Sequence, residues 1–275
     1  MTVLLVDWLG RGGVAQYSDA WVHELREAGH DVAVVTRPGR ELAPTEPVAV
    51  ARRGGKLAAH RHVVDAATHA IDALHPSTVV VQNFLIPAME WKVHRAARRA
   101  GARTVFVVHD HRLHSRRAGV HFGLDRCVRA ADVVVAHSHF VGDAAGAKAG
   151  RTDITVVPLG IPVGLLELPR PGSPPTIPGD GQLAVHFGAL QRSYKGTATV
   201  VDLAGAGVAG WRFAIVGNGA PERVPGAQVI RGFVDGGTLV SAVASSQATL
   251  LPYSYATQSG AVALAQSLGS VVVST

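Results

Sequence analysis

The first strongly patterned stretch of the chain covers residues 3–29. Its apolar run, residues 3–6, is typical of a buried central strand in a parallel sheet. Apolar side chains then recur at three- and four-residue steps and predict an amphipathic helix with one apolar face: Val14, Tyr17, Trp21, Leu25 and Ala28. Gly29 stands where a helix favours a left-handed residue, and residues 31–36 predict a second strand. The pattern predicts a βαβ unit whose turn faces a ligand.

Strands and helices continue to alternate after a predicted loop at residues 37–55. The spacing predicts helices at 57–74, 88–100, 122–131 and 138–149, and strands at 78–81, 104–108, 133–136 and 154–157. Gly101 closes the second of these helices, and Ser138 caps the last one. This alternation predicts a doubly wound parallel sheet.

Residues 162–182 are crowded with proline and glycine and show no periodicity, which predicts a linker. A second α/β half then begins, with strands predicted at 183–187, 212–216, 228–230, 248–251 and 271–274 and helices at 197–206, 237–245 and 259–268. We therefore expect an N-terminal Rossmann-like domain at 1–161 and a second, partial one at 183–275. The chain stops after a strand predicted to be buried, which indicates a fragment or an unusually short second domain.

Composition narrows the class of protein without identifying it. The 275 residues suffice for one large or two ordinary domains, and 47% hydrophobic with 17% charged residues describes a globular chain. No apolar run has the length of a membrane span and no leader pattern is present, so we expect a cytoplasmic protein. The single cysteine, Cys127, excludes an internal disulfide and is predicted to be a buried thiol. The net charge of +6 fits either arginine-rich solvated helices or an anionic partner surface, without the aromatic-interleaved basic stripe of a nucleic-acid site.

The first candidate site is the glycine turn at residues 10–15, which matches the dinucleotide fingerprint G-x-G-x-x-A. Residues 7–9 separate it from the predicted strand, where that fingerprint needs a tight turn. No acidic residue follows the second strand to bind a ribose, although Arg37 suits the 2′-phosphate of NADP. Two further interpretations stay open. The glycines serve only to allow positive φ, or Gly12 and Gly13 let a substrate approach the backbone at a helix N-terminus.

The second candidate site is the segment His109-Asp110-His111-Arg112-Leu113-His114, which follows a predicted strand. Histidine and aspartate are metal ligands, but adjacent side chains point apart on an extended segment and no H-x-x-x-H spacing is present. A plain cluster of loop histidines is a second interpretation. We favour the third, a single functional His109 presented at the strand end.

The second half offers further turns at strand ends. Residues 188–196 contain Arg192 and Lys195, and a lysine beside a glycine is a usual diphosphate partner. Gly217-Asn218-Gly219 follows the next predicted strand. Residues 257–260 open the last helix and form another potential anion site by the helix dipole.

Several short segments occur in a fixed order along the chain. They are Gly12-Gly13-Val14 with residues 29–32, residues 131–134 with Ser138, residues 156–161, 187–196, 215–219 and 230–234, and Leu251-Pro252 with residues 259–269. In this order they resemble the motifs of the GT-B glycosyltransferases, specifically the large retaining GT4-like family (glycosyltransferase group 1). The resemblance covers nearly the whole chain.

The resemblance implies two Rossmann-like domains facing a cleft, with the acceptor mainly on the first domain and the nucleotide sugar mainly on the second. His109 would contact the donor sugar and be the catalytic residue, Lys195 would hold the diphosphate, and the helix beginning at Gly260 would neutralise the leaving phosphates. The donor-binding set would further include Arg192, Gly217, Gly219, Phe233, Gln258, Ser259 and Ala261, and Gly12 and Gly13 would form an acceptor or phosphate loop. No metal or other cofactor is implied, and the chain has no Asp-x-Asp.

Three positions depart from the family pattern. Ala189 stands where an arginine is usual, so Gln191 or Arg192 has to substitute, and the usual glutamate pair is absent near Thr257-Gln258 and at Ala265. The predicted function is transfer of a sugar from a nucleoside-diphosphate sugar to a small-molecule, lipid-linked or glycan acceptor, with retention. A non-catalytic nucleotide- or glycan-binding module and an NADP-dependent oxidoreductase are the alternatives. We expect no nucleic-acid partner and leave a peripheral membrane contact open.

Overall fold

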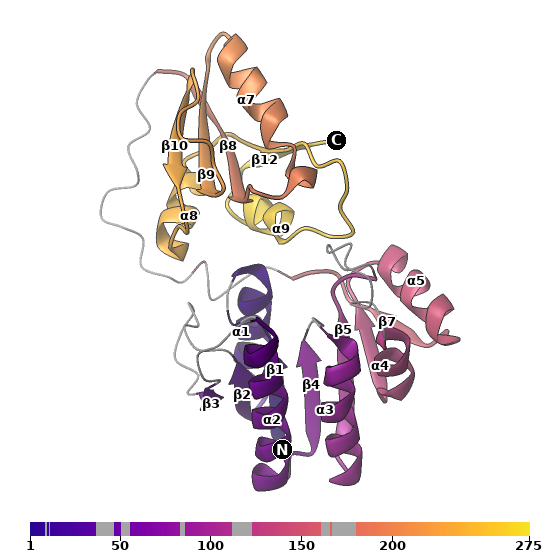
Figure 1. The fold of residues 1–275 in the computed structure, drawn as a ribbon. Coiled ribbons are helices and arrows are strands. Elements are labelled where there is room, and N and C mark those ends of the chain that lie inside the picture. The colour runs from indigo at the N-terminus through magenta and orange to yellow at the C-terminus, as the bar shows by residue number, and fades with distance from the viewer. Residues whose placement is uncertain are drawn as a thin grey trace. The chain divides into compact units, whose positions relative to one another are not determined.

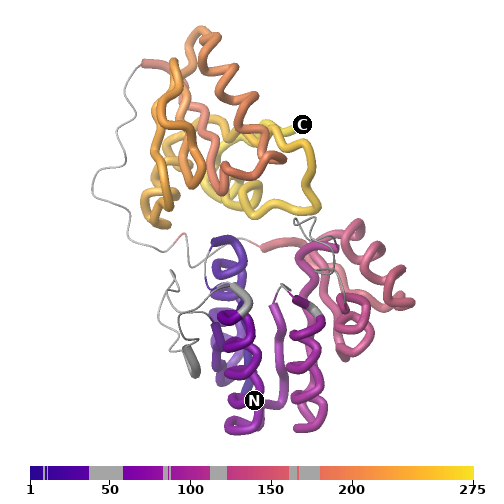
Figure 2. The backbone as a smooth tube through the Cα atoms, in the orientation of Figure 1, coloured from indigo at the N-terminus to yellow at the C-terminus, as the bar shows by residue number. Residues whose placement is uncertain are grey.

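A computed structural model describes residues 1–8, 10, 12–36, 47–50, 56–82, 86–111, 123–160, 166 and 180–275. The chain divides into two compact units, Met1–Gly160 and Ile161–Thr275, and each is described by itself (Figure 1). Figure 2 traces the backbone of each unit. Residues 162–165 and 167–179 of the predicted linker lie outside the described residues.

In the first unit, the described strands form a seven-stranded parallel sheet in the order β3-β2-β1-β4-β5-β6-β7. The strands are β1 (Thr2–Asp7), β2 (Asp31–Thr36), β3 (Pro47–Val50), β4 (Thr78–Gln82), β5 (Arg103–Val108), β6 (Val133–Ala136) and β7 (Ile154–Val156). The helices that connect them are α1 (Gly12–Glu27), α2 (Lys56–Leu74), α3 (Pro87–Arg99), α4 (Leu124–Ala130) and α5 (His139–Ala149). Gly29 and Gly101 have positive φ and Ser138 accepts a hydrogen bond from the N–H of Val141, as the sequence predicts.

Successive side chains of a strand point to opposite faces of the sheet. Apolar residues of β1 therefore lie on both faces, and helices cover both. Val3 and Leu5 pack with Val22 of α1 in one buried cluster. Leu4 and Val6 pack in another, larger cluster with side chains from α2, α3, α4 and α5. The predicted doubly wound architecture is therefore confirmed. Cys127 is fully buried in the larger cluster, as predicted.

The second unit contains a five-stranded parallel sheet in the order β10-β9-β8-β11-β12. Its strands are β8 (Gln182–Ala189), β9 (Trp211–Asn218), β10 (Ala227–Arg231), β11 (Ala248–Leu251) and β12 (Val271–Ser274). The helices are α7 (Thr197–Ala206), α8 (Gly236–Ala244) and α9 (Gly260–Ser267), with a short 3-10 turn, η1 (Ser193–Lys195), before α7. Ala184 of β8 packs against α7, and the alternating Leu183 and Val185 are also buried, so this sheet is covered on both faces.

Three element predictions need correction. The predicted loop at residues 37–55 contains β3, which pairs with the open edge of β2; residues 37–46 and 51–55 lie outside the described residues. Strands β8 and β9 continue through glycines read as turns, because Gly188 and Gly217 pair with each other across the ladder. Strand β12 is not buried: among the described strands it pairs with β11 and forms the edge of the sheet, and its Val271 and Val273 are 65% and 51% exposed.

Strand order defines the point at which ligands bind in open α/β sheets, namely the carboxyl ends of neighbouring strands whose connections run in opposite directions. In the first unit this point lies between β1 and β4, and in the second unit between β8 and β11. The glycine turn at residues 10–13 follows β1. The segment containing Lys195 follows β8, and Pro252 follows β11. Each unit therefore has one expected ligand edge.

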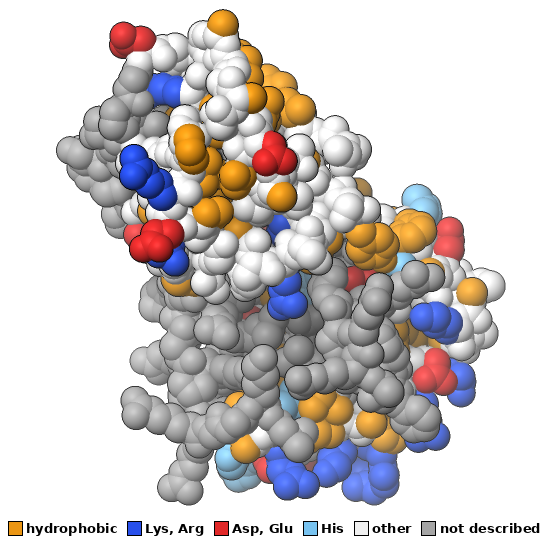
Figure 3. Space-filling view, turned by 45° about the horizontal axis from the view of Figure 1, so that its top comes forward, with side chains coloured by type: hydrophobic (Ala, Val, Ile, Leu, Met, Phe, Trp, Pro, Cys, Tyr) orange, Lys and Arg blue, Asp and Glu red, His pale blue; other side chains and the backbone are white. Residues whose placement is uncertain are grey.

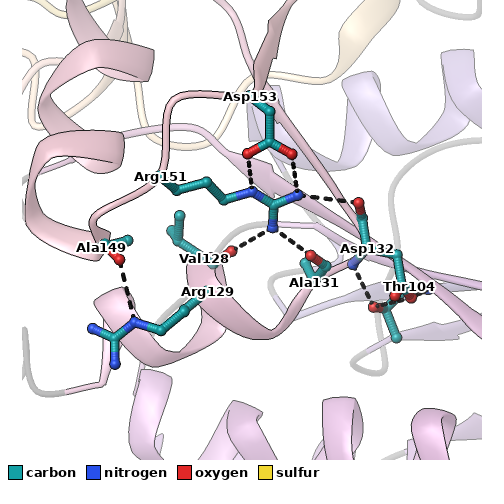
Figure 4. Close-up of polar contacts among 8 residues, drawn as sticks. All are labelled: Thr104, Val128, Arg129, Ala131, Asp132, Ala149, Arg151 and Asp153. Carbon is teal, nitrogen blue, oxygen red and sulfur yellow. Dashed lines mark hydrogen bonds and ion pairs between the residues drawn. The ribbon is translucent and has the colours of Figure 1, made fainter.

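A network of polar contacts fixes the end of α4 in the first unit (Figure 4). The Arg151 guanidinium donates to the backbone carbonyls of Val128, Ala131 and Asp132 and forms an ion pair with Asp153. These bonds satisfy carbonyl groups that the end of a helix leaves without intrahelical partners. The ends of α4 and α5 and the start of β6 are thereby held together.

No helix of the described residues is both long enough and apolar enough to cross a bilayer.

Replacing Gly196 by alanine is expected to destabilise the second unit by about 2 kcal/mol or more, since left-handed strain and overpacking each cost about 1–3 kcal/mol. Gly196 has a φ of 66°, and a Cβ there would overlap the backbone carbonyl of Pro252. Gly205→Ala is the matched control, because Gly205 lies in α7 with open space around a Cβ. Urea unfolding measures the stability of both variants. Equal midpoints for the two variants would contradict the prediction.

Candidate functional site

The turn after β1 is anchored to the strand by a buried carboxylate. Asp7, the last residue of β1, is fully buried and accepts a hydrogen bond from the backbone N–H of Gly10 at 3.1 Å. Gly10 and Gly12 have φ values of 63° and 65°, a conformation that favours glycine. Leu9 and Arg11 lie outside the described residues. The turn delivers the N-terminus of α1 to the ligand edge of the first unit.

Gly13 has no such conformational reason to be glycine. Its φ is not in the left-handed region, and a Cβ added there would meet nothing within 4 Å. The interpretation that these glycines only allow positive φ therefore fits Gly10 and Gly12 but leaves Gly13 unexplained. Open space beside a glycine at a helix N-terminus is compatible with close approach of a ligand to the backbone.

His109 lies directly after β5 and forms the centre of an aromatic cluster. Its Nε2 is 3.0 Å from Oε1 of Gln82, the last residue of the neighbouring β4. Its ring centroid is 5.1 Å from those of both Tyr17, on α1, and His137, directly after β6. Tyr17 and His137 also contact each other edge to face, with centroids 4.6 Å apart. Four elements thus bring their side chains together at the carboxyl edge of the sheet.

Both histidines of this cluster are held in the neutral form. Burial, and then the neighbouring His137, lowers the pKa of His109 to about 3. Burial also lowers the pKa of His137, although its hydrogen bond to the carbonyl of Val157 works in the opposite direction. A carbonyl oxygen only accepts, so His137 donates through Nδ1–H and, with Gln82 Oε1 as acceptor, His109 donates through Nε2–H. As a whole residue His109 is half-buried, and with Nε2 protonated the lone pair of its ring is on Nδ1.

Sequence reasoning selected His109 and missed its partners. The helical spacing places Tyr17 on the apolar face of a helix; the residue is half-buried, and burial raises the pKa of its hydroxyl to about 12. Gln82 and His137 each stand at the end of a predicted strand, which was the available signal. Because β4, β5 and β6 are neighbours in the sheet, the side chains at the ends of these three strands lie close together and form the cluster.

The other described residues of the histidine segment, Asp110 and His111, have contacts different from those of His109. Asp110 and His111 are buried, and the His111 ring packs against Phe140 at 5.1 Å. Residues 112–114 lie outside the described residues. Among the residues that the structure does describe, no group of three or more His, Cys, Asp or Glu side chains could hold a metal ion.

Lys195 lies at the ligand edge of the second unit, between two tyrosines. Its Nζ donates to the Tyr253 hydroxyl at 2.5 Å and lies 4.0 Å from the centroid of the same ring and 5.6 Å from that of Tyr194. Burial lowers the pKa of Lys195 to about 8. A Cβ on Gly188 would be 3.8 Å from Nζ, so the ammonium lies over the glycine backbone at the end of β8. This lysine is therefore not an ordinary solvated side chain.

Tyr253 connects Lys195 to the last helix. Its hydroxyl also forms a hydrogen bond with Ser259, the N-cap residue of α9. Burial raises the pKa of Tyr253 to about 12, so the phenol is neutral and both accepts and donates hydrogen bonds. Lys195 and Ser259, both predicted donor-binding residues, are thereby brought to one place by a tyrosine that the sequence analysis did not select.

The predicted glycines of this unit are required by packing. Gly217 has a φ of 141°, and a Cβ there would overlap the carbonyl of Gly188. Gly219 has a φ of 84°, and a Cβ there would lie 2.4 Å from the backbone N of Gln191. Gly217 thus allows the ends of β8 and β9 to pair closely, and Gly219 allows the turns after these strands to touch, which positions the segment that carries Lys195.

The remaining predicted residues are more dispersed over the second unit. Arg192 is exposed in the turn before η1, and Phe233 is 64% exposed after β10. Gln258 and Ser259 are half-buried, Gly260 is exposed, and Ala261 follows it in the first turn of α9. The described structure thus groups the side chains of Lys195, Tyr253 and Ser259 by direct contact. The backbone carbonyl of Arg192 also accepts a hydrogen bond from the backbone N–H of Lys195 at 3.0 Å.

The two parallel α/β units, each with polar side chains at its ligand edge, match the GT-B fold of solved glycosyltransferase structures. The chain belongs to the glycosyltransferase 4-like domain family, whose sequence pattern it matches over residues 12–160, more than half of its length. Comparison with curated protein sequences gives no significant match.

Solved structures similar to this chain include several glycosyltransferases. HepE from Anabaena, in complex with UDP-glucose, has a TM-score of 0.65 at 14% identity, covering 100% of this chain and 80% of HepE. The lipopolysaccharide outer core galactosyltransferase WaaB, in its apo form, has a TM-score of 0.60 at 16% identity, with coverage of 100% and 80%. An α-glucosyltransferase in complex with UDP and DNA has a TM-score of 0.63 at 13% identity, with coverage of 100% and 79%. At these identities the likeness shows the fold.

Proposed function

We propose that this chain transfers a sugar from a nucleoside-diphosphate sugar to an acceptor, with retention at the anomeric carbon, as a hexosyltransferase-type enzyme. The observation that carries the proposal is the position of Lys195, a half-buried cation at the ligand edge of the second unit. An ammonium in this place suits the diphosphate of a donor, and HepE, whose fold is similar, has been solved in complex with UDP and with UDP-glucose.

Each unit contributes a different part of the reaction. In the second unit, Lys195 and the N-terminus of α9 stabilise the negative charge that develops on the leaving nucleoside diphosphate, without a required metal or other cofactor. In the first unit, neutral His109 contacts the transferred sugar by hydrogen bonding. Gln82, Tyr17 and His137 position the His109 ring and do not themselves react.

The first unit also binds the acceptor in this proposal. The open space beside Gly13 and the N-terminus of α1 favour an acceptor with hydroxyl or phosphate groups near the turn. A small molecule, a glycan and a lipid-linked sugar all carry such groups.

The donor is tested by a thermal-shift screen of the whole chain with UDP, GDP, ADP, dTDP and NADPH. A ligand that binds only the folded state raises the melting temperature by mass action. We expect a shift with one nucleoside diphosphate and none with NADPH, followed by turnover of the matching sugar nucleotide. A shift with NADPH alone would support the oxidoreductase alternative. If the chain binds a nucleotide but neither transfers nor slowly hydrolyses the matching sugar nucleotide, the result would favour a non-catalytic module.

A further inference from the structure

A buried histidine connects the two central strands of the second unit to a helix. His186 belongs to β8 and has an exposed fraction of 0%. Its Nδ1 is 2.8 Å from the backbone carbonyl oxygen of Leu250, which lies on β11. Its Nε2 is 3.1 Å from the hydroxyl oxygen of Thr197, the first residue of α7. One imidazole ring thus joins β8, β11 and the start of α7.

The two strands stop pairing at the position of this ring. The ladder between β8 and β11 ends at Val185 and Thr249. His186 and Leu250 are the next residues of the two strands, and both strands continue beyond them. The hydrogen bond from the His186 side chain therefore takes the place of a further backbone pairing. Neighbouring parallel strands that separate at their carboxyl ends open the crevice in which α/β sheets bind ligands.

The hydrogen-bond roles of the ring follow from its partners. A carbonyl oxygen only accepts, so His186 donates to Leu250 through Nδ1–H. Burial lowers the pKa of His186 and the Lys195 charge lowers it as well, although the bond to Leu250 works in the opposite direction. The ring is therefore neutral, and its Nε2 accepts the hydroxyl proton of Thr197. The carbonyl of Leu190, 3.4 Å from the same hydroxyl oxygen, is the more distant acceptor.

The bond to Thr197 lies close to Lys195 in the chain. Gly196 alone separates the two residues, and its φ of 66° and the overlap of an added Cβ with a neighbouring carbonyl show how tightly this link is packed. On the other side of Lys195, the carbonyl of Tyr194 accepts a hydrogen bond from the backbone N–H of Ser254 at 2.9 Å. The short turn that carries Lys195 is thus fixed at both of its ends.

The charge of the second unit depends on single cations. Residues 180–275 contain one lysine, Lys195. On the visible face of this unit, few Lys and Arg side chains lie among hydrophobic and uncharged surface (Figure 3). A displaced Lys195 would therefore have no second lysine in these residues to replace it at the ligand edge.

We propose that His186 is a positioning residue for Lys195, because its ring joins β11 to the start of α7 and so keeps the ammonium over the end of β8. His186 is buried and acts through Thr197 and the backbone of η1. Its importance for donor binding rests on the proposed function. Its effect on the surroundings of Lys195 can be measured without a ligand.

The test uses variants of the full chain. His186→Leu removes both hydrogen bonds of the ring, and Thr197→Val removes only the hydroxyl. His186→Asn keeps a side-chain N–H near the position of Nδ1 and is the conservative variant. Thr199→Val, at an exposed position of α7, is the matched control for Thr197→Val. Val240→Ala shortens a fully buried side chain of α8 and controls for a loss of stability alone. Circular dichroism and urea unfolding first establish that each variant is folded.

The first measurement is the pKa of Lys195 in the absence of ligand. The chain has four lysines, so lysine labelled with carbon-13 and nitrogen-15 gives few NMR signals, and Lys195→Arg identifies the one required. Burial lowers this pKa to about 8 in the parent. We expect His186→Leu and Thr197→Val to raise it by about one pH unit or more toward its usual value, since a displaced ammonium gains water. His186→Asn should raise it less than His186→Leu, and both control variants should leave it unchanged.

The second measurement is binding of UDP and of inorganic pyrophosphate by calorimetry. We expect His186→Leu and Thr197→Val to weaken binding by about threefold to tenfold, the effect of one lost hydrogen bond. A raised Lys195 pKa with unchanged binding of both probes would support the positioning role and count against the donor site of the proposed function. An unchanged Lys195 pKa in the folded Thr197→Val protein, or an equal rise in Val240→Ala, would overturn the proposal.

Discussion

Replacing His109 by alanine is expected to lower kcat by about 100-fold, the usual effect of removing one preorganised hydrogen-bonding group, while donor affinity changes little. The ring is held neutral and oriented by Gln82, so its contribution falls on the sugar and not on the nucleotide. Initial rates over a range of donor concentrations separate kcat from KM. The measurement requires the donor identified by the thermal-shift screen.

Two further variants sharpen this test. His69→Ala removes an exposed histidine from α2 and is expected to leave both constants unchanged. Gln82→Leu removes only the acceptor that orients His109 and is expected to lower kcat by a smaller factor than His109→Ala. Full activity of a folded His109→Ala protein would remove this residue from the reaction.

Replacing Lys195 by alanine is expected to weaken nucleoside-diphosphate binding by about tenfold or more, since hydrogen bonds to charged groups contribute about 1.5–3 kcal/mol. Lys92→Ala, which removes an exposed lysine from α3, is the charge-matched control and should not change the Kd. Tyr253→Phe keeps the ring beside Lys195 but removes its hydroxyl, and is expected to have the smaller effect. Unchanged affinity of the Lys195→Ala protein would exclude this lysine from the donor site.

The pH dependence of binding gives an independent measurement for Lys195. Burial lowers the pKa of Lys195 to about 8, so the ammonium is present below that pH and is lost as the pH rises through it. Affinity of the parent protein for the nucleoside diphosphate is therefore expected to fall above pH 8. The bound diphosphate favours the charged form and moves the transition to higher pH. The Lys195→Ala protein should not show this fall, and an identical pH profile would contradict the assignment.

The elements of both sheets could largely be predicted from hydrophobic periodicity. Runs such as residues 78–81 and 104–108 are apolar because both faces of the sheet are covered, and a run of this kind leaves little ambiguity. The incorrect predictions concern residues whose secondary structure depends on pairing with a neighbouring strand. Residues 47–50 become a strand because the edge of β2 is open to them, and Gly188 and Gly217 continue their strands because they pair with each other.

Some residues of the candidate site could likewise be selected from the sequence, and others only from the structure. His109, Lys195 and Ser259 were selectable because each lies at the end of a strand or the start of a helix. Tyr17, Gln82, His137 and Tyr253 were not, since a side chain's partners depend on which strands become neighbours.

The α/β class of this protein, its division into two halves and the turns at the carboxyl ends of its strands could be predicted from the sequence, because these features follow from local periodicity and glycine placement. Three features emerge from the folded protein alone: His109 is a neutral ring held by three neighbours, Lys195 is a half-buried cation beside Tyr253, and Gly217 and Gly219 are required by packing. The physical reason is that burial and proximity, which set pKa and orientation, arise from contacts between residues distant in the chain.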